Sequence, residues 1–288
     1  MSQSQHQRRR PFLKQPLFWL LILVALAVSL WRTGLQNAAN LQARSIEWRV
    51  VGWPVDETRV AIFSDWHLGT GPTMPRSVEA IRRHTVQGFA PHLIFMLGDF
   101  IDESLGHSDV EPDTIYQVFR RFQAPLGTYV VLGNHEHWYG KKRILPVLKM
   151  AGMTLLNNES RMLPLGSGTI ALAGVVDHMT DTPDTKRALA GVLPTIPTLM
   201  LSHDPAVFRD LPDRGRILMV AGHTHGGQVV LPGLGILWMP TPIPKAWAHG
   251  WVQKGRNAMY VTSGVGVSLL PVRFGVLPEV VWLTVRPA

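Results

Sequence analysis

Side chains that can bind metal ions follow several short apolar runs in this 288-residue chain. The groups concerned are Ser64-Asp65-Trp66-His67, Gly98-Asp99-Phe100-Ile101-Asp102, Gly133-Asn134-His135-Glu136, Ser202-His203-Asp204 and Gly222-His223-Thr224-His225. A single group of this kind is usually a turn or a helix cap, and a pair of histidines is common on protein surfaces. Their recurrence after successive apolar runs indicates a shared site.

The apolar runs themselves predict buried strands. They are continuous rather than alternating, as expected for strands covered on both faces, and lie at 60–63, 93–97, 129–132, 199–201 and 217–220. Further strands are predicted at 46–51, 169–176, 259–262 and 280–285, and helices at 76–87, 114–122, 141–150, 185–191 and 206–211. This alternation predicts an α/β fold, although it allows one doubly wound sheet as well as two facing sheets.

The carboxyl ends of strands in such a sheet are where ligands bind. The predicted strands therefore bring carboxylate, imidazole and amide groups together, from Asp65, His67, Asp99, Asn134, His203, His223 and His225. This sulfur-free set suits Mn²⁺, Fe or Zn²⁺, and it is too large for one transition metal but suits two that share a carboxylate. The chain contains no cysteine, which excludes thiolate ligands, disulfides and a cysteine nucleophile.

In this order and spacing the motifs resemble those of the calcineurin-like metallophosphoesterase superfamily, whose blocks read Asp-x-His, Gly-Asp, Gly-Asn-His-Asp/Glu, His and Gly-His-x-His. The resemblance covers residues 59–288. Gly226-Gly227, Pro271-Val272-Arg273-Phe274 and Pro278-Glu279 are similar to a membrane-anchored or exported bacterial subgroup, like the UDP-2,3-diacylglucosamine hydrolase-like phosphodiesterases. That subgroup commonly has an arginine where this chain reads Ser263-Gly264-Val265-Gly266.

The resemblance implies a four-layer α/β/β/α sandwich and a role for each site residue. One divalent metal would be held by Asp65, His67 and His225, a second by Asn134, His203 and His223, and Asp99 would bridge both. The two metals would share a hydroxide and direct it at phosphorus, with His135 as the general acid for the leaving oxygen. We expect Asp102 and Glu136 to orient imidazoles rather than to bind metal. No organic cofactor is implied.

The expected reaction is hydrolysis of a phosphodiester or pyrophosphate bond, including one in a lipid or glycolipid. UDP-2,3-diacylglucosamine hydrolysis, a step of lipid A synthesis, is an alternative that needs a cytoplasmic active site. A non-catalytic scaffold is another alternative, disfavoured because all the expected ligands are present. A nuclease is disfavoured because residues 51–288 carry 21 basic and 19 acidic side chains without a basic run, so we expect no nucleic-acid partner. The sequence does not indicate an oligomeric state.

The N-terminus combines positive charge with an apolar run. Residues 1–50 hold seven Lys or Arg and one Glu, and the uncharged run 15–31 has no polar face, which predicts a membrane segment near the short limit of about 17–25 residues. Arg9-Arg10-Pro11-Phe12-Leu13-Lys14 resembles a twin-arginine export signal, which we expect to be retained as a signal anchor. The excess of positive charge before the run predicts a cytoplasmic N-terminus and a domain on the outer side of the inner membrane.

These features divide the chain into a signal or signal anchor at 1–32, a connector with the first strand at 33–57, and a metallophosphoesterase domain at 58–288. Within the domain, residues 234–251 are rich in Trp and Pro and more apolar than an exposed loop. We expect this segment to pack over one edge of the sandwich. The alternative is a lobe that contacts a bilayer surface or an acyl chain.

Overall fold

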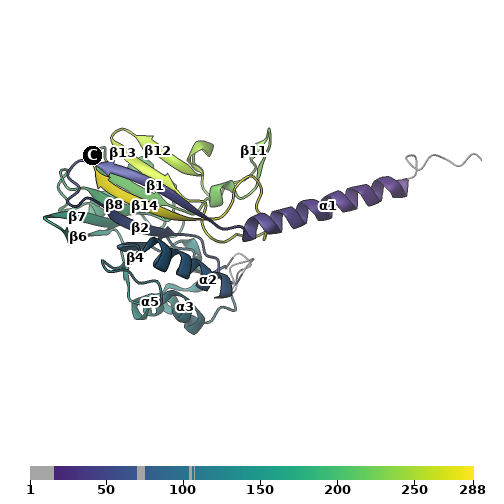
Figure 1. Cartoon of the computed structure of the whole chain (residues 1–288), viewed down its shortest axis with the longest axis horizontal. Helices are drawn as coiled ribbons and strands as arrows, with labels where there is room; N and C mark the ends of the chain where they lie inside the picture. The colour runs from purple at the N-terminus through teal and green to yellow at the C-terminus, as the bar shows by residue number, and fades with distance from the viewer. Residues whose placement is uncertain (1–15, 70–74, 104–105, 107) are drawn as a thin grey trace, which may run out of the picture.

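A computed structural model describes residues 16–69, 75–103, 106 and 108–288 (Figure 1). A long helix, α1 (Pro16–Ala39), projects from one end of a body built on two sheets. Of the helices in these described residues, only α1 is long and apolar enough to cross a membrane. The twin-arginine motif at Arg9-Arg10 lies outside the described residues.

The first sheet combines the N-terminal half of the chain with its last strand. Its order is β1 (Gln42–Val50), β14 (Glu279–Pro287), β2 (Thr58–Phe63), β3 (Leu93–Met96), β4 (Thr128–Val130) and β5 (Met153–Leu155). Strands β2 to β5 are parallel, whereas β14 runs antiparallel to β2 and parallel to β1. The carboxyl ends of β2, β3 and β4 therefore lie at one edge.

The second sheet has a parallel centre between antiparallel edges. Its order is β12 (Gly250–Lys254), β13 (Asn257–Val261), β9 (Ile217–Ala221), β8 (Thr198–Leu201), β7 (Gly168–Gly174) and β6 (Glu159–Leu165). Strands β13, β9, β8 and β7 are parallel, and β12 and β6 pair antiparallel at either side. A separate hairpin of β10 (Val230–Leu231) and β11 (Gly235–Ile236) follows β9.

Three apolar clusters show how the layers stack. The middle cluster joins the facing sheets, with Ile62 and Phe95 from the first and Leu201 and Val220 from the second. The other face of the first sheet packs against α2 (Pro75–Arg82), η2 (Arg83–Phe89), α3 (Pro112–Phe119) and α5 (Lys141–Met150). The other face of the second sheet packs against the shorter α6 (Thr185–Ala188) and η3 (Pro205–Asp210). The predicted four-layer α/β/β/α sandwich is confirmed.

The end of α1 is attached to the body of the protein. The helix continues past Trp31 to Ala39, and Gly34 and Ala38 are its buried residues. A Cβ atom on Gly34 would lie 2.7 Å from Cζ of Phe274, so this close contact requires glycine. The backbone N–H of Arg273 also donates to the carbonyl oxygen of Gly34 at 3.0 Å. The last turns of α1 thus belong to the packed domain, beyond the apolar run 15–31.

Candidate metal centre

The polar residues singled out in the sequence meet at the carboxyl ends of the strands. Asp65 and His67 follow β2, Asp99 follows β3, and Asn134 begins the short helix α4 (Asn134–Tyr139) after β4. His203 follows β8, and His223 and His225 follow β9. Each of these side chains belongs to a residue that is at most 5% exposed. The two sheets therefore bring all seven expected ligands to one buried place.

Three clusters of Asp and His side chains each have the geometry of a metal site among the described residues, and two of them consist only of expected ligands; the third is His67, Asp102 and His135. The ligand atoms of Asp65, His67 and His225 lie within 4.8 Å of one another, and so do those of Asp99, His203 and His223. Oδ2 of Asp99 lies 3.3 Å from Nε2 of His203 and 3.6 Å from Nε2 of His67. Asp99 therefore reaches an imidazole of both clusters.

The imidazoles face one another in a way that suits bound cations. Nε2 of His67 lies 3.1 Å from Nε2 of His225, and Nε2 of His203 lies 3.0 Å from Nδ1 of His223. Two ring nitrogens at this distance can share only one proton, whereas a cation between them accepts both lone pairs. The donor set, all oxygen and nitrogen, therefore fits divalent metal ions.

Buried atoms without partners support the same conclusion. Oδ1 of Asn134 and Nε2 of His223 are buried and accept or donate no hydrogen bond within the described part of the chain. A buried polar atom without a partner costs about 1–3 kcal/mol, which a metal ligand bond would remove. Burial lowers the pKa of His223 to about 4, so its ring is neutral at neutral pH, as a metal ligand must be.

The ring of His203 is oriented toward the candidate metal site by a backbone carbonyl. Its Nδ1 lies 2.7 Å from the carbonyl oxygen of Leu97, to which it donates, and this fixes Nε2 toward Asp99. Burial opposes a charge on the ring, but the neighbouring carboxylate of Asp99 raises the pKa of His203 well above its usual range. A divalent cation bound here would displace the proton from Nε2 of His203, and its charge would then pair with the carboxylate of Asp99.

The backbone around the site is strained. Asp65, His67, Asp99, His223 and His225 have φ angles of 55°, 44°, 52°, 68° and 50°. Each non-glycine residue in this left-handed region costs of order 1–3 kcal/mol, and such residues cluster at functional sites. The strain persists because buried contacts, among them those of Gly133, Gly222 and Glu136, hold the loops in these conformations.

Glycines allow the loops to approach the carboxylates. A Cβ atom on Gly133 would lie 2.2 Å from Oδ1 of Asp99, and one on Gly222 would lie 2.6 Å from Oδ2 of Asp65. These are the glycines of the Gly-Asn-His and Gly-His-x-His motifs. Their role is therefore steric, since any side chain would displace a candidate ligand.

Glu136 connects two of the ligand loops through their backbones. It is fully buried and accepts hydrogen bonds from the backbone N–H groups of Asp99, Phe100 and Gly133 at 2.9, 2.7 and 2.8 Å. Burial and the charge of Asp99 raise its pKa to about 7. The sequence suggested that Glu136 orients an imidazole, and the structure instead shows that it accepts hydrogen bonds from backbone amides.

Asp102 does lie beside imidazoles, with Oδ1 3.8 Å from Nδ1 of both His67 and His135.

His135 lies beside the two clusters with one ring nitrogen engaged. Its Nδ1 accepts a hydrogen bond from the backbone N–H of Glu103 at 2.8 Å, which leaves the proton of the neutral ring on Nε2. That atom lies 3.9 Å from Oδ2 of Asp99. Burial lowers the pKa of His135 to about 4, so the ring is neutral at neutral pH.

Arg273 supports the site in a way that the sequence did not predict. It is fully buried, and its guanidinium donates to the carbonyl oxygens of His225, Ser263 and Gly266 at 3.2, 2.7 and 2.6 Å. Its Nη2 also lies 3.4 Å from Nδ1 of His225. Burial lowers the pKa of Arg273 to about 10, which leaves the side chain charged. The Pro271–Phe274 motif was the available signal.

Two further acidic residues, Asp204 and Asp177, are buried near the site. Asp204, which follows His203, accepts hydrogen bonds from the backbone N–H of Ala206 and from Oγ1 of Thr241, and its Oδ2 lies 3.5 Å from Nδ1 of His178. Asp177, which follows the apolar run of β7, is 1% exposed, and burial raises its pKa. Each lies three residues after the end of a buried strand, β8 for Asp204 and β7 for Asp177, and this position was the available signal.

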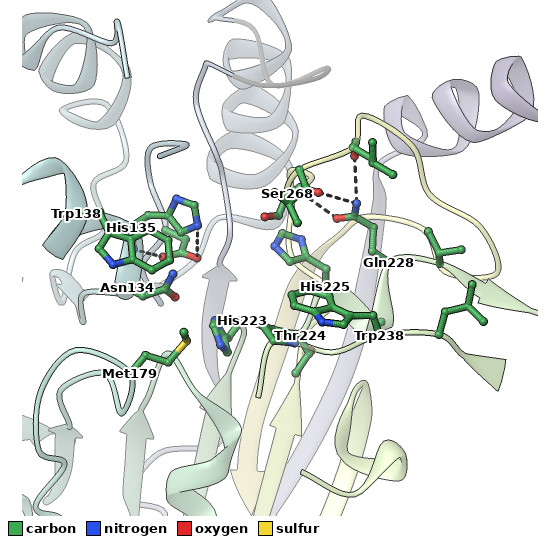
Figure 2. A pocket seen from close by; sticks show the side chains of 17 residues that line it. Asn134, His135, Trp138, Met179, His223, Thr224, His225, Gln228, Trp238 and Ser268 are labelled. Atoms are coloured by element: carbon green, nitrogen blue, oxygen red, sulfur yellow. Dashed lines mark hydrogen bonds and ion pairs between the residues drawn. The ribbon is translucent and has the colours of Figure 1, made fainter. Parts of the chain in front are cut away.

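A cavity of about 600 Å³ opens over the clusters (Figure 2). On one side it is lined by Asn134, His135 and Trp138, and across from them lie His225, Gln228 and Trp238 (Figure 2). His223 and Thr224 lie between these two groups. Met179, Leu237, Leu269 and Leu270 also line the cavity and make its sides apolar. The cavity therefore joins a polar floor to apolar sides.

Comparisons with known proteins agree with this geometry. The family model for calcineurin-like phosphoesterases matches residues 58–227. An uncharacterized metallophosphoesterase of Bacillus subtilis, YkuE, is 31% identical over 239 residues, which are 80% of each chain. The phosphodiesterase YaeI of Escherichia coli is 31% identical over 205 residues, 67% of this chain and 70% of that one. The structure of Haemophilus influenzae NAD nucleotidase, 15% identical, covers 73% of this chain and 50% of its own with a TM-score of 0.50, which shows a common fold.

Proposed function

This chain belongs to the calcineurin-like phosphoesterase family, and from that premise we propose that it hydrolyses a phosphodiester or pyrophosphate bond with the aid of two divalent metal ions. Family membership makes it a metal-dependent phosphoesterase. The proposal of two metal ions rests on the pair of Asp and His clusters with Asp99 beside imidazoles of both. A shared carboxylate between two clusters is the arrangement that two neighbouring ions require.

The seven buried residues divide between the two ions. Asp65, His67 and His225 would hold one, Asn134, His203 and His223 the other, and Asp99 would bridge them. When bound, such ions supply an activated water as the nucleophile and positive charge for the phosphate oxygens. Manganese, iron and zinc all suit oxygen and imidazole donors, and we propose manganese as the first metal to test.

His135 is the proposed general acid. The N–H of Glu103 occupies its Nδ1, so the proton of the neutral ring lies on Nε2, from which it can form a hydrogen bond to the leaving oxygen. Full transfer of that proton requires the imidazolium form, which the carboxylate of Asp102, 3.8 Å from Nδ1, would stabilise. Asp102, beside Nδ1 of both His67 and His135, orients the two rings. Glu136 keeps the loops of Asp99 and Gly133 together, which positions Asp99 next to the loop of Asn134.

The apolar walls of the cavity favour a substrate with an apolar part, as in a lipid or a glycolipid. We further propose that α1 anchors the protein in the inner membrane with the domain on the outer side, because the basic residues precede the apolar run. UDP-2,3-diacylglucosamine hydrolysis would suit the same cavity but needs the opposite orientation, so topology separates these two substrates.

The test is a metal screen on the full chain. Metal-free protein is supplied with Mn²⁺, Fe²⁺ or Zn²⁺ and assayed with bis(p-nitrophenyl) phosphate and with p-nitrophenyl phosphate, followed by phospholipids and nucleotide-linked sugars. We expect metal-dependent turnover of the diester to exceed that of the monoester. Inactivity with every metal and substrate would instead favour a scaffold role for the fold.

A further inference from the structure

Apolar side chains stand out around the mouth of the cavity. We call Leu234, Leu237, Trp238, Leu269 and Leu270 the apolar rim; their exposed fractions are 70, 57, 63, 58 and 52%. Four of them line the cavity, and Leu234 lies in the turn between β10 and β11. A group of large exposed apolar residues beside a ligand cavity marks an interaction surface.

The rim is held in its exposed position by polar contacts behind it. The side chain of Gln228 donates to the carbonyl oxygens of Ser268 and Leu270 at 2.8 and 3.1 Å and accepts from the backbone N–H of Ser268 at 2.9 Å. Nζ of Lys245 donates to the carbonyl oxygen of Ile236 at 2.8 Å. Both loops are therefore fixed by hydrogen bonds while their leucines and Trp238 face outward.

Part of the remainder of the segment 234–251 packs against the body, as a covering loop does, although Trp251 at its end is 46% exposed. Ile243 and Ala248 are buried, and the ring of Trp247 contacts Phe208 edge-on at 5.7 Å. The exposure of Leu234, Leu237 and Trp238 is therefore confined to the part of the segment beside the cavity, where a partner can reach it.

A continuous chain of backbone contacts joins the rim to the end of α1. Phe274 donates its N–H to the carbonyl oxygen of Gln228, and Arg273 donates its N–H to that of Gly34, both at 3.0 Å. Nδ2 of Asn37 also donates to the carbonyl oxygen of Arg273 at 3.1 Å. Figure 1 shows the hairpin strand β11 at the same end of the body as the base of α1. The rim and the base of the helix thus form one surface.

The projecting part of α1 is apolar on every side. Leu17, Leu20, Leu23, Leu26 and Leu30 are between 55 and 63% exposed. The apolar run 15–31 would span about 25 Å at about 1.5 Å per residue, a little less than the bilayer core of about 30 Å, and it ends at Trp31, one turn before Gly34. The membrane surface would then lie next to the rim.

We propose that the apolar rim lies in the interfacial layer of the bilayer that α1 crosses, so that the cavity opens toward the membrane lipids. The occupant of the rim is lipid, because the docked helix brings a bilayer to this surface without any further partner. Leucines would be buried among the acyl chains, and Trp238 suits the headgroup boundary. The inference rests on α1 spanning a membrane, and it extends the proposed function by placing the site beside lipid phosphoesters.

Single-cysteine labelling tests the proposal directly, because the chain has no cysteine of its own. Leu234→Cys is labelled with an NBD fluorophore, and the full chain is reconstituted in phosphatidylcholine and phosphatidylglycerol vesicles with or without doxyl-labelled lipid. The matched control is Leu193→Cys, a leucine that is 62% exposed and precedes β8, whereas the site follows β8. Metal content of both variants verifies that they fold.

We expect the label at position 234 to shift to the blue and to be quenched severalfold by doxyl lipid, and the label at 193 to remain unquenched. Equal, weak quenching at both positions would overturn the proposal. A blue shift that depends on protein concentration and not on doxyl lipid would also overturn it, since a second copy would then cover the rim. Quenching needs no hydrolysis, so an inactive protein with a quenched rim would contradict only the proposed function.

Discussion

Asp99 is the carboxylate that lies beside imidazoles of both candidate clusters. Its Oδ2 lies within 3.9 Å of imidazole nitrogens from His67, His135 and His203, and its Oδ1 accepts the backbone N–H of His135. We expect Asp99→Ala to lose most of its bound metal, because both ions lose a ligand and the imidazoles lose the charge that draws them together. Elemental analysis of the purified full chain measures the content.

Asp102 provides the matched control for that experiment. It is also a buried aspartate at the site, but its Oδ1 lies 3.8 Å from Nδ1 atoms rather than between the two clusters. Asp102→Ala should therefore keep most of its metal. Full metal content in Asp99→Ala would contradict the bridging assignment, whatever the result for Asp102.

Turnover of two esters distinguishes the proposed role of His135 from that of a ligand. His135→Ala should retain its metals but slow hydrolysis of an alkyl phosphodiester by about 10²–10⁴-fold, since a poor leaving group needs the proton. A nitrophenyl ester should lose less, because nitrophenolate departs without help. The rates of both esters and the metal content are measured on the same preparation.

The neighbouring residue supplies the contrast. Asn134→Ala removes a proposed ligand whose Oδ1 is buried without a partner, so it should weaken metal binding and slow both esters alike. Equal losses on the two esters in His135→Ala would refute the acid role. Asp204, buried near His178, would then be the next candidate.

At the scale of elements, the strands beneath the site could be predicted and the edge strands β6 and β12 could not. Strands β2, β3, β8 and β9 are buried throughout or nearly so, and their continuous apolar runs were visible in the sequence. Strand β6 is half exposed and includes Pro164, and β12 exposes Gln253 and Lys254, so neither has a clear apolar pattern. Pairing with a neighbour, rather than composition, makes these edge segments strands.

The convergence of the candidate ligands could be predicted for a related reason, whereas the contacts that support them could not. Each ligand follows a buried strand, so local pattern and sheet topology bring them together. Arg273 reaches His225 from 48 residues further along the chain, and Glu136 binds backbone amides of a different loop. Contacts of this kind depend on three-dimensional packing, which periodicity does not record.

Arg273 leads to a prediction about the loops that it joins. Arg273→Lys keeps the charge but lacks the planar donors that reach His225, Ser263 and Gly266 together. We expect a loss of about 1–3 kcal/mol of unfolding free energy for each carbonyl left without a donor, and a loss of metal from the cluster that contains His225. Thermal unfolding and metal stoichiometry measure the two effects.

An exposed arginine serves as the control for this substitution. Arg256→Lys changes a side chain that is 71% exposed and pairs with Asp213 at 3.6 Å, where the change should have little effect on stability or metal. If Arg273→Lys unfolds at a lower temperature yet keeps full metal content, then the guanidinium stabilises the fold without positioning His225.

For the whole molecule, the position of the domain relative to the membrane decides which lipids it can meet. Helix α1 is docked through Gly34 and Ala38, so the body must follow the side on which the helix ends. Four basic residues precede the apolar run, Arg8, Arg9, Arg10 and Lys14, and Arg32 follows it. This bias predicts that the domain is outside the cytoplasm.

A reporter that fluoresces only in the cytoplasm, fused after Ala288, should therefore be dark. Changing Arg9→Lys and Arg10→Lys together should block translocation if the twin-arginine motif is what the export machinery reads, and the reporter should then become fluorescent. Export that survives the lysine pair would identify an ordinary signal anchor and leave the topology unchanged. Protease access to the domain from the cytoplasmic side would reverse the topology, and it would then make UDP-2,3-diacylglucosamine the favoured substrate, because that lipid is hydrolysed on the cytoplasmic face.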